Sequence, residues 1–289
     1  MLLKALHYAR AADVEEACDL LRHEEGSKVL AGGQSLLPLI NTGLVDPDLL
    51  VDISHIADMK GLSQRDGYLE LGALTRHVEL ASSEDVRASQ PLLTEAASHV
   101  GNPRVRNRGT IGGSLAHADP AAELPLVLTA LGATLVATDG RSTREIKSDE
   151  LALSYLSTQL APDEIVTRVR VPVLGPGWGW SFSEMSRRTG DFAIVAVAVL
   201  IRSADGYVLE ARVAAAGVGA RPTRLGGVEA ALSGATRTEL QGRLGDVPAV
   251  ATEVDPVSDG VASAGYRRHL LTVLVRRGID QAFARSEGQ

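Results

Sequence analysis

The sequence predicts a folded protein of mixed helices and strands, with a small α/β unit at its start and an antiparallel sheet with helices at its end. Three observations carry this prediction. Helical and strand patterns alternate through residues 1–56. Pro172–Gly179 holds two Pro and three Gly, which favours a domain boundary. After it, Gly179–Ser186, Phe192–Arg202 and Val208–Val218 alternate like strands of one antiparallel sheet.

The first unit begins with a predicted helix over Asp13–His23, whose apolar residues fall on one face. Asp13 suits the N-cap, with Glu16 three residues later, and Gly26 suits the end. The elements expected next are a strand at Lys28–Ala31, a helix from Leu36 to about Asn41 and a strand at Leu49–Ile53.

The middle of the chain mixes both periodicities. A helix is expected after Asp119-Pro120, since Asp can cap it and Pro suits its first turn. The predicted elements are strands at Tyr68–Leu74, Ala133–Thr138 and Ile165–Val171, helices at Thr75–Ser82, Leu92–Val100 and through Glu123 to Leu131, and a loop at Gly101–Gly113. Further helices are predicted at Val228–Leu232, Arg237–Arg243 and Tyr266–Ala284.

Composition excludes several classes of function. The 289 residues carry 29 Lys and Arg against 36 Asp and Glu, and the net charge of −7 disfavours a nucleic-acid partner. The single cysteine, Cys18, cannot supply an iron–sulfur cluster, a cysteine zinc site or an internal disulfide. Its apolar neighbours predict a small buried side chain.

No targeting or membrane segment is predicted. Met1–Glu16 lacks an apolar signal core and reaches acidic residues quickly. The cleanest apolar run, Ala193–Ile201, is nine residues long and too short to span a bilayer. We therefore expect a soluble, cytoplasmic protein.

The first candidate site is a glycine loop, Ala31-Gly32-Gly33-Gln34-Ser35, at the end of a predicted strand. Paired glycines let a ligand approach the backbone closely, and consecutive N–H groups in such a turn can bind an anion. The loop can therefore be a cradle for a diphosphate, and a plain strand–helix turn is the alternative.

A second glycine loop runs through Thr110-Ile111-Gly112-Gly113-Ser114 and on to Asp119 and Glu123. Asp119 and Glu123 would share a face if one helix ran through both, although such carboxylates can also serve only as caps. Two such loops suit a dinucleotide whose phosphates are held from both sides. A branched side chain at Gly112 is expected to block the phosphate and prevent binding.

Other chemistries do not fit these loops. Neither contains the Gly-x-Gly-x-x-Gly pattern of dinucleotide-binding Rossmann folds, and neither ends in the Gly-Lys-Ser/Thr of a P-loop. Ser114 is not flanked as in a Gly-x-Ser-x-Gly elbow, which argues against a hydrolase. The histidines show no paired metal-ligand spacing.

Nearly the whole chain resembles the FAD-binding medium subunits of molybdenum hydroxylases, the group of bacterial carbon monoxide, xanthine, nicotine and caffeine dehydrogenases. The most specific match is Asn107-Arg108-Gly109-Thr110-Ile111-Gly112-Gly113-Ser114 with Ala118-Asp119-Pro120-Ala121-Ala122-Glu123-Leu124-Pro125. Further matches are Ala31–Pro38, Arg187–Ala193, Gly217–Pro222 and the segment from Tyr266 to Arg277.

The resemblance implies an α+β fold, in which a two-subdomain FAD-binding module of the vanillyl-alcohol-oxidase type precedes a C-terminal domain with a three-stranded antiparallel sheet and helices. The corresponding divisions are residues 1–56, 57–173 and 174–289. The implied FAD-binding residues are Ala31, Gly32, Gly33, Gln34, Ser35, Thr110, Ile111, Gly112, Gly113, Ser114, Asp119, Glu123 and Phe192, the last beside the isoalloxazine ring.

The implied function is electron transfer by an oxidoreductase subunit. Electrons would come from [2Fe–2S] clusters on a small partner subunit, itself fed by a molybdenum cofactor on a large subunit, and would leave the FAD for an external acceptor. The implied assembly is a dimer of heterotrimers. Two alternatives remain open: a stand-alone FAD-dependent oxidase or dehydrogenase, and a scaffold subunit without flavin.

Overall fold

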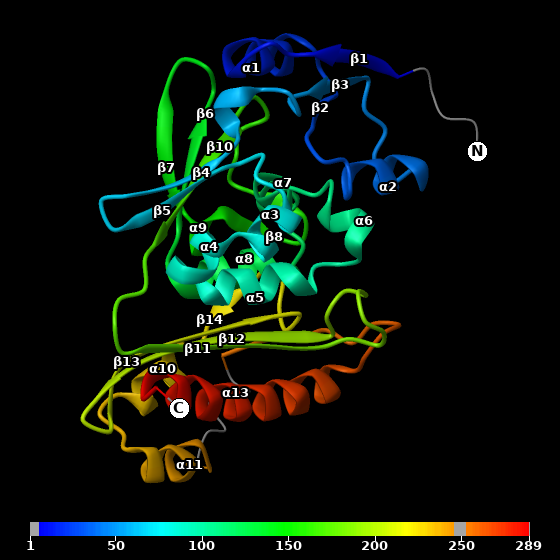
Figure 1. The fold of residues 1–289 in the computed structure, drawn as a ribbon. Coiled ribbons are helices and arrows are strands. Elements are labelled where there is room, and N and C mark those ends of the chain that lie inside the picture. The colour runs from blue at the N-terminus through cyan, green and yellow to red at the C-terminus, as the bar shows by residue number, and fades with distance from the viewer. Residues whose placement is uncertain (1–5, 246–252, 289) are drawn as a thin grey trace.

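The structure is a computed structural model that describes residues 6–245 and 253–288. A small parallel sheet of order β1-β3-β2 comes first (Figure 1). The predicted cap is confirmed, because the Asp13 carboxylate accepts from the Glu16 N–H at 2.9 Å. The elements of this unit are β1 (His7–Arg10), α1 (Val14–His23), β2 (Ser27–Leu30), α2 (Leu36–Asn41) and β3 (Leu49–Asp52).

A five-stranded antiparallel sheet of order β4-β5-β10-β6-β7 follows. Its strands are β4 (Leu62–Arg65), β5 (Tyr68–Gly72), β6 (Thr134–Thr138), β7 (Thr143–Lys147) and β10 (Ile165–Pro172). The other elements of this part are η1 (Ala57–Met59), α3 (His77–Ser82), α4 (Glu84–Ser89), α5 (Pro91–His99), α9 (Ser148–Leu151), β8 (Ala152–Ser154) and β9 (Ser157–Thr158).

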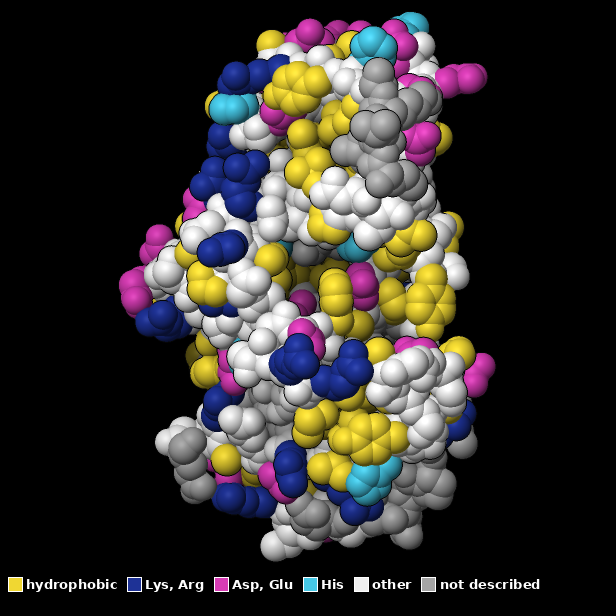
Figure 2. Space-filling model, turned by 90° about the vertical axis from the view of Figure 1, so that its right-hand side faces the viewer, with side chains coloured by type: hydrophobic (Ala, Val, Ile, Leu, Met, Phe, Trp, Pro, Cys, Tyr) yellow, Lys and Arg dark blue, Asp and Glu magenta, His cyan; other side chains and the backbone are white. Residues whose placement is uncertain are grey.

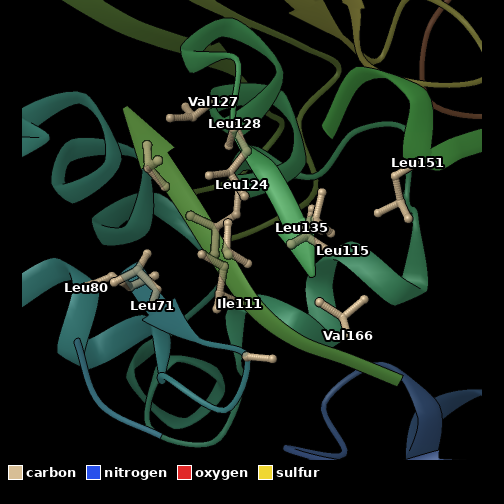
Figure 3. Packing of buried hydrophobic residues seen from close by; sticks show 14 of the residues in the cluster. Leu71, Leu80, Ile111, Leu115, Leu124, Val127, Leu128, Leu135, Leu151 and Val166 are labelled. Carbon is tan, nitrogen blue, oxygen red and sulfur yellow. The ribbon is translucent and has the colours of Figure 1, made fainter. Parts of the chain in front are cut away.

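The segment predicted as a loop at Gly101–Gly113 contains helices, which corrects that prediction. A short helix α6 (Pro103–Arg106) is followed by α7 (Ile111–His117), so Gly112 and Gly113 are helical. Tertiary packing outweighs the low helix propensity of glycine here, because Ile111 and Leu115 point from α7 into the core (Figure 3). The Thr110 hydroxyl caps α7 by accepting from the Gly113 N–H at 3.1 Å.

The next helix, α8 (Glu123–Leu131), also begins later than predicted, and its N-cap is Ala122 rather than Asp119. Asp119 instead accepts from the Ala121 N–H at 2.8 Å within a turn. Asp119 and Glu123 therefore do not share one helix. All residues of α8 are buried, since it lies between the five-stranded sheet and the C-terminal sheet.

The C-terminal sheet has the order β11-β12-β13-β14 and is antiparallel throughout. The implied three strands are thus one too few, because β14 contributes only two residue pairs and is too short for an alternation pattern. Phe192 lies in the loop before β12 rather than in a strand. The elements are β11 (Trp178–Met185), β12 (Val195–Ala204), β13 (Tyr207–Ala216), β14 (Thr223–Arg224), α10 (Gly226–Leu232), α11 (Arg237–Gly245) and α13 (Ala264–Ser286).

This sheet is covered on both faces, which explains the apolar run that forms β12. Ala196, Ala198 and Leu200 belong to the core shared with the first part of the chain. Val197 and Val199 belong to a second core on the opposite side. Figure 1 shows the resulting layers, with α5 and α8 above the sheet and α13 below it. Helix α5 is tied to this region because Trp180 Nε1 donates to the Glu95 carboxylate at 3.0 Å.

The described residues contain neither a membrane-crossing helix nor a metal-binding cluster. No helix there is both long and apolar enough to cross a membrane. No group of three or more His, Cys, Asp or Glu side chains there is placed to hold a metal ion. The first five residues of Met1–Glu16 lie outside the described part.

Candidate functional site

A cavity of about 1220 Å³ is lined by both glycine loops. Such a volume exceeds the usual pocket for a drug-sized molecule and suits a long ligand. Figure 2 shows a face hollowed near its middle, with hydrophobic and acidic side chains around the opening. Twelve of the predicted site residues line the cavity: Ala31, Gly32, Gly33, Gln34, Ser35, Thr110, Gly112, Gly113, Ser114, Asp119, Glu123 and Phe192.

Ile111 is the exception among the predicted residues. Its side chain is buried in the core, and its N–H donates to the Thr75 carbonyl at 3.0 Å. The motif does not distinguish it from its neighbours, because the side chain turns away from the cavity only once α7 forms.

The first loop presents a row of unpaired backbone donors. The N–H groups of residues 32–36 have no acceptor among the described residues. Gly33 has φ of +72°, a left-handed conformation that glycine adopts without strain. The Gln34 side chain braces the turn by donating to the Gly32 carbonyl at 3.3 Å. Successive N–H groups in such a turn form a concavity suited to an anion.

The second loop differs, because the N–H groups of residues 111–114 are already bonded within the protein. Gly112 donates to Ala73 at 2.8 Å, and Ser114 donates to the Thr110 carbonyl at 3.0 Å. Gly113 donates to the Thr110 hydroxyl. The groups left for a ligand are the hydroxyls of Thr110 and Ser114, so the two loops offer backbone and side-chain donors respectively.

The glycines of both loops also allow close packing. A Cβ atom at Gly32 would meet the carbonyl oxygen of Arg108 at 2.1 Å. One at Gly112 would meet the Cβ of Ala73 at 2.6 Å. A larger side chain at position 112 would therefore collide with the protein itself, and that it would also block a phosphate stays a prediction. At Gly113 an added Cβ would meet only the Thr110 hydroxyl oxygen.

His77 lies behind the second loop and was not predicted as a site residue. It is buried, and its Nε2 is 3.5 Å from the Ser114 hydroxyl oxygen. Burial, helped by nearby Arg106, lowers the pKa of His77 to about 4, so the ring is neutral near pH 7. No motif surrounds His77, and only the fold brings it to the loop.

Glu123 is the buried carboxyl of the cavity, with 7 % of its surface exposed. Burial raises the pKa of Glu123 to about 7, and the charges of Glu184 and Asp119 add to the effect. The side chain can therefore carry a proton near neutral pH and donate a hydrogen bond. Asp119 lines the same wall but is partly accessible.

Phe192 stands at the edge of the cavity and is 66 % exposed. Its loop is held against the segment before α6, because Gly190 has φ of +86° and lies close to the Gly101 carbonyl. An exposed aromatic ring at the edge of a cavity can pack on a planar ligand.

Residues of the β8–β9 hairpin complete the wall and were not predicted either. Leu156, Thr158 and Leu160 line the cavity. Leu156 has φ of +51°, and its N–H donates to the Ala118 carbonyl at 3.3 Å, which ties the hairpin to the end of α7. The strands of this hairpin are only two or three residues long and leave no alternation pattern.

Two family models match parts of this chain. Residues 4–174 match the family described as the FAD binding domain in molybdopterin dehydrogenase. Residues 180–282 match the CO dehydrogenase flavoprotein C-terminal domain.

Individual relatives are similar over the whole length. The chain is 37% identical to the nicotine 6-hydroxylase medium subunit of Paenarthrobacter nicotinovorans, covering 99% of this chain and 100% of the relative. A structure of carbon monoxide dehydrogenase from Hydrogenophaga pseudoflava superposes with a TM-score of 0.94 at 33% identity and 99% coverage of both chains. The structure of quinoline 2-oxidoreductase from Pseudomonas putida 86 superposes with a TM-score of 0.92 at 32% identity, covering 100% of this chain and 99% of the other.

Proposed function

Since this chain belongs to the family of FAD-binding medium subunits of molybdenum hydroxylases, we propose that the cavity between its glycine loops holds FAD and that the chain hands electrons to an external acceptor. The observation that carries the proposal is the row of N–H groups on residues 32–36, which find no acceptor within the described part of the chain and line a cavity large enough for a dinucleotide. The chain is thus an oxidoreductase subunit.

The first loop is assigned to the diphosphate. Residues 32–36 supply backbone donors, while Gly32 allows the close approach of the Arg108 backbone and Gly33 adopts the left-handed conformation of the turn. This loop carries no basic side chain, so the dipoles of the backbone would do the binding. Thr110 and Ser114 add hydroxyl donors from the opposite wall.

Asp119, Glu123 and Phe192 are assigned to the part of the cofactor beyond the phosphates. Asp119 and Glu123 lie on one wall and can bond hydroxyl or ring nitrogen groups, Glu123 as a donor when protonated. Phe192 provides an apolar surface for the flavin ring. No acid–base catalyst is assigned.

FAD supplies the redox chemistry when bound, and the protein supplies binding, orientation and a controlled environment. The [2Fe–2S] clusters that would supply electrons to bound FAD belong to a partner subunit, since the one cysteine of this chain, the buried Cys18, cannot ligate a cluster. The molybdenum cofactor belongs to a large subunit. The finer assembly we propose is a cytoplasmic dimer of heterotrimers, which native mass measurement of the purified complex would check.

Division into subdomains at residues 1–56 and 57–173, with a C-terminal domain at 174–289, is part of the same proposal. The first two subdomains together are assigned to a FAD-binding module of the vanillyl-alcohol-oxidase type. Both glycine loops belong to the first two subdomains, while Phe192 comes from the third. The cavity is lined by residues of all three segments.

The test begins with the colour of the purified complex. We expect a visible flavin absorption band and FAD released on denaturation, and co-purification of a small Cys-rich chain and a large chain. A colourless complex that cannot be reconstituted with FAD would support the flavin-free scaffold. Full turnover of a substrate by this chain alone would support the stand-alone enzyme.

A further inference from the structure

Arg267 is a buried arginine on α13 that none of the motifs assigned to the cofactor includes. Only 7 % of its surface is exposed. Its Nη1 donates to the Ile194 carbonyl at 2.5 Å and to the Gly217 carbonyl at 2.9 Å. Its Nη2 donates to Asp259 at 2.7 Å. One side chain therefore holds the start of α13, the start of β12 and the end of β13 together.

Both carbonyls bonded by Arg267 belong to segments that connect directly to residues lining the cavity. Ile194 lies two residues after Phe192, which stands at the cavity edge. Gly217 donates its N–H to the Pro120 carbonyl at 2.9 Å, and Pro120 directly follows Asp119. Gly217 also packs so closely that a Cβ there would meet the Ile194 carbonyl oxygen at 2.4 Å.

We infer that Arg267 is a positioning residue for the flavin site, acting through Ile194 on Phe192 and through Gly217 on the Asp119 segment. This inference rests on the proposed function, because it assumes that the cavity holds FAD. A planar guanidinium can bond two carbonyls and a carboxylate at once, whereas an ammonium is a flexible point charge. The position therefore requires arginine rather than any cation.

Burial makes the arrangement rigid. Asp259 supplies the counter-charge and also accepts from the Val261 and Ala262 N–H groups, so it holds the guanidinium from a fixed turn. Removing the guanidinium would leave the buried Ile194 carbonyl and the partly buried Gly217 carbonyl without these bonds, which is costly. The two segments would then move independently of each other.

The first measurement is hydrogen exchange in the flavin-free full chain, read on peptides covering residues 186–194 and 213–219. For Arg267→Met we expect exchange in both peptides to accelerate by about tenfold or more, while the C-terminal half of α13 stays unchanged. The control is Arg268→Met, since Arg268 is the next residue on α13 and is a partly exposed side chain that pairs with the exposed Asp255 at 3.7 Å.

The second measurement is the fluorescence of FAD in the reconstituted complex. We expect weaker FAD retention and a changed flavin emission in Arg267→Met, because a loosened Phe192 segment alters the surroundings of the ring. Arg267→Lys is expected to restore part of both, and Asp259→Asn to give an intermediate exchange rate. If Arg267→Met does not fold, the exchange rates and flavin emission of these two variants test the inference in its place.

Unchanged exchange and emission in a folded Arg267 variant, or equal effects in Arg268→Met, would overturn the inference. The exchange measurement needs no cofactor. Failure of the wild-type chain to bind FAD would therefore refute the proposed function and leave the exchange result to judge Arg267 as a link between the two segments.

Discussion

Gly32 of the first loop lies directly against the backbone of Arg108, just before the second loop, and a Cβ on Gly32 would stand 2.1 Å from the Arg108 carbonyl oxygen. The two walls of the cavity are therefore in contact through backbone atoms, which cannot yield as a flexible side chain can. The spacing of the two walls therefore depends on the absence of a side chain at Gly32.

The first prediction follows from this contact. Gly32→Ala should lower the free energy of unfolding by about 1–3 kcal/mol and weaken FAD retention, because the loops must separate. Thermal unfolding and flavin content measure the two effects. Gly175→Ala is the matched control, since a Cβ at Gly175 meets no atom within 4 Å. Equal stability of the two variants would contradict the prediction.

The second prediction separates the paired glycines of the second loop. Gly112→Ala should destabilise the protein by about 1–3 kcal/mol, since its Cβ would overlap Ala73. Gly113→Ala should change stability by less than about 1 kcal/mol, because its Cβ meets only the Thr110 hydroxyl, at 2.9 Å, and the higher helix propensity of alanine offsets the weakened Thr110 cap on α7. It should nevertheless weaken FAD binding by displacing that hydroxyl. Denaturant unfolding and flavin titration of both variants test the distinction; the same loss of stability in both would refute it.

The third prediction concerns the pH dependence of the flavin-free chain. The pKa of Glu123 is raised from 4.5 to about 7 on folding, so the folded state holds this proton more tightly. Its stabilising effect is present below about pH 4.5 and is lost as the pH rises through about 7. The loss should reach at most about 3 kcal/mol.

Glu123→Gln removes this titration and keeps the shape of the side chain. Unfolding measured by denaturant at pH 5 and pH 8 should show a smaller fall in stability for the variant than for the wild type. Other titrating groups are common to both proteins and cancel in the comparison. Identical pH dependence would mean that Glu123 does not titrate in this range.

The fourth prediction concerns the attachment of α5 to the C-terminal sheet. Glu95 accepts from Trp180 at 3.0 Å and from Arg285 at 3.1 Å. Because Glu95 is partly exposed, Glu95→Ala should cost only about 1 kcal/mol. A double-mutant cycle with Arg285→Ala should give a coupling energy, whereas Glu84→Ala, at an exposed pair with Arg87, should have almost no effect. An additive cycle would contradict the expected coupling.

Local patterns predicted many of the elements well. The α1 cap, α2 and the main strands follow from capping residues and apolar periodicity, and these signals are local. The burial of Cys18 followed from its neighbours in the same way, and it is confirmed at 0 % exposure. The prediction failed at α7, where the buried Ile111 and Leu115 hold two glycines in a helix.

The candidate site was predictable as motifs but not as geometry. Both glycine loops are visible in the sequence, and the cavity brings them together. Which donors remain free could not be predicted, because the acceptors for the second loop are Ala73 and Thr75 on a distant segment. His77 and Arg267 were missed for the same reason: each acts through contacts that only the fold creates.

The bond from Gly217 to Pro120 bears on any attempt to use the first half of this chain as a portable flavin module. A chain ended near residue 174 would keep both glycine loops, yet it would lack Phe192 and the N–H group that fixes Pro120. It would also uncover the apolar face of α8 that now packs on β12 and β13. A transplantable unit must therefore include the C-terminal sheet, and engineers seeking a flavin carrier should exchange cavity residues within the chain.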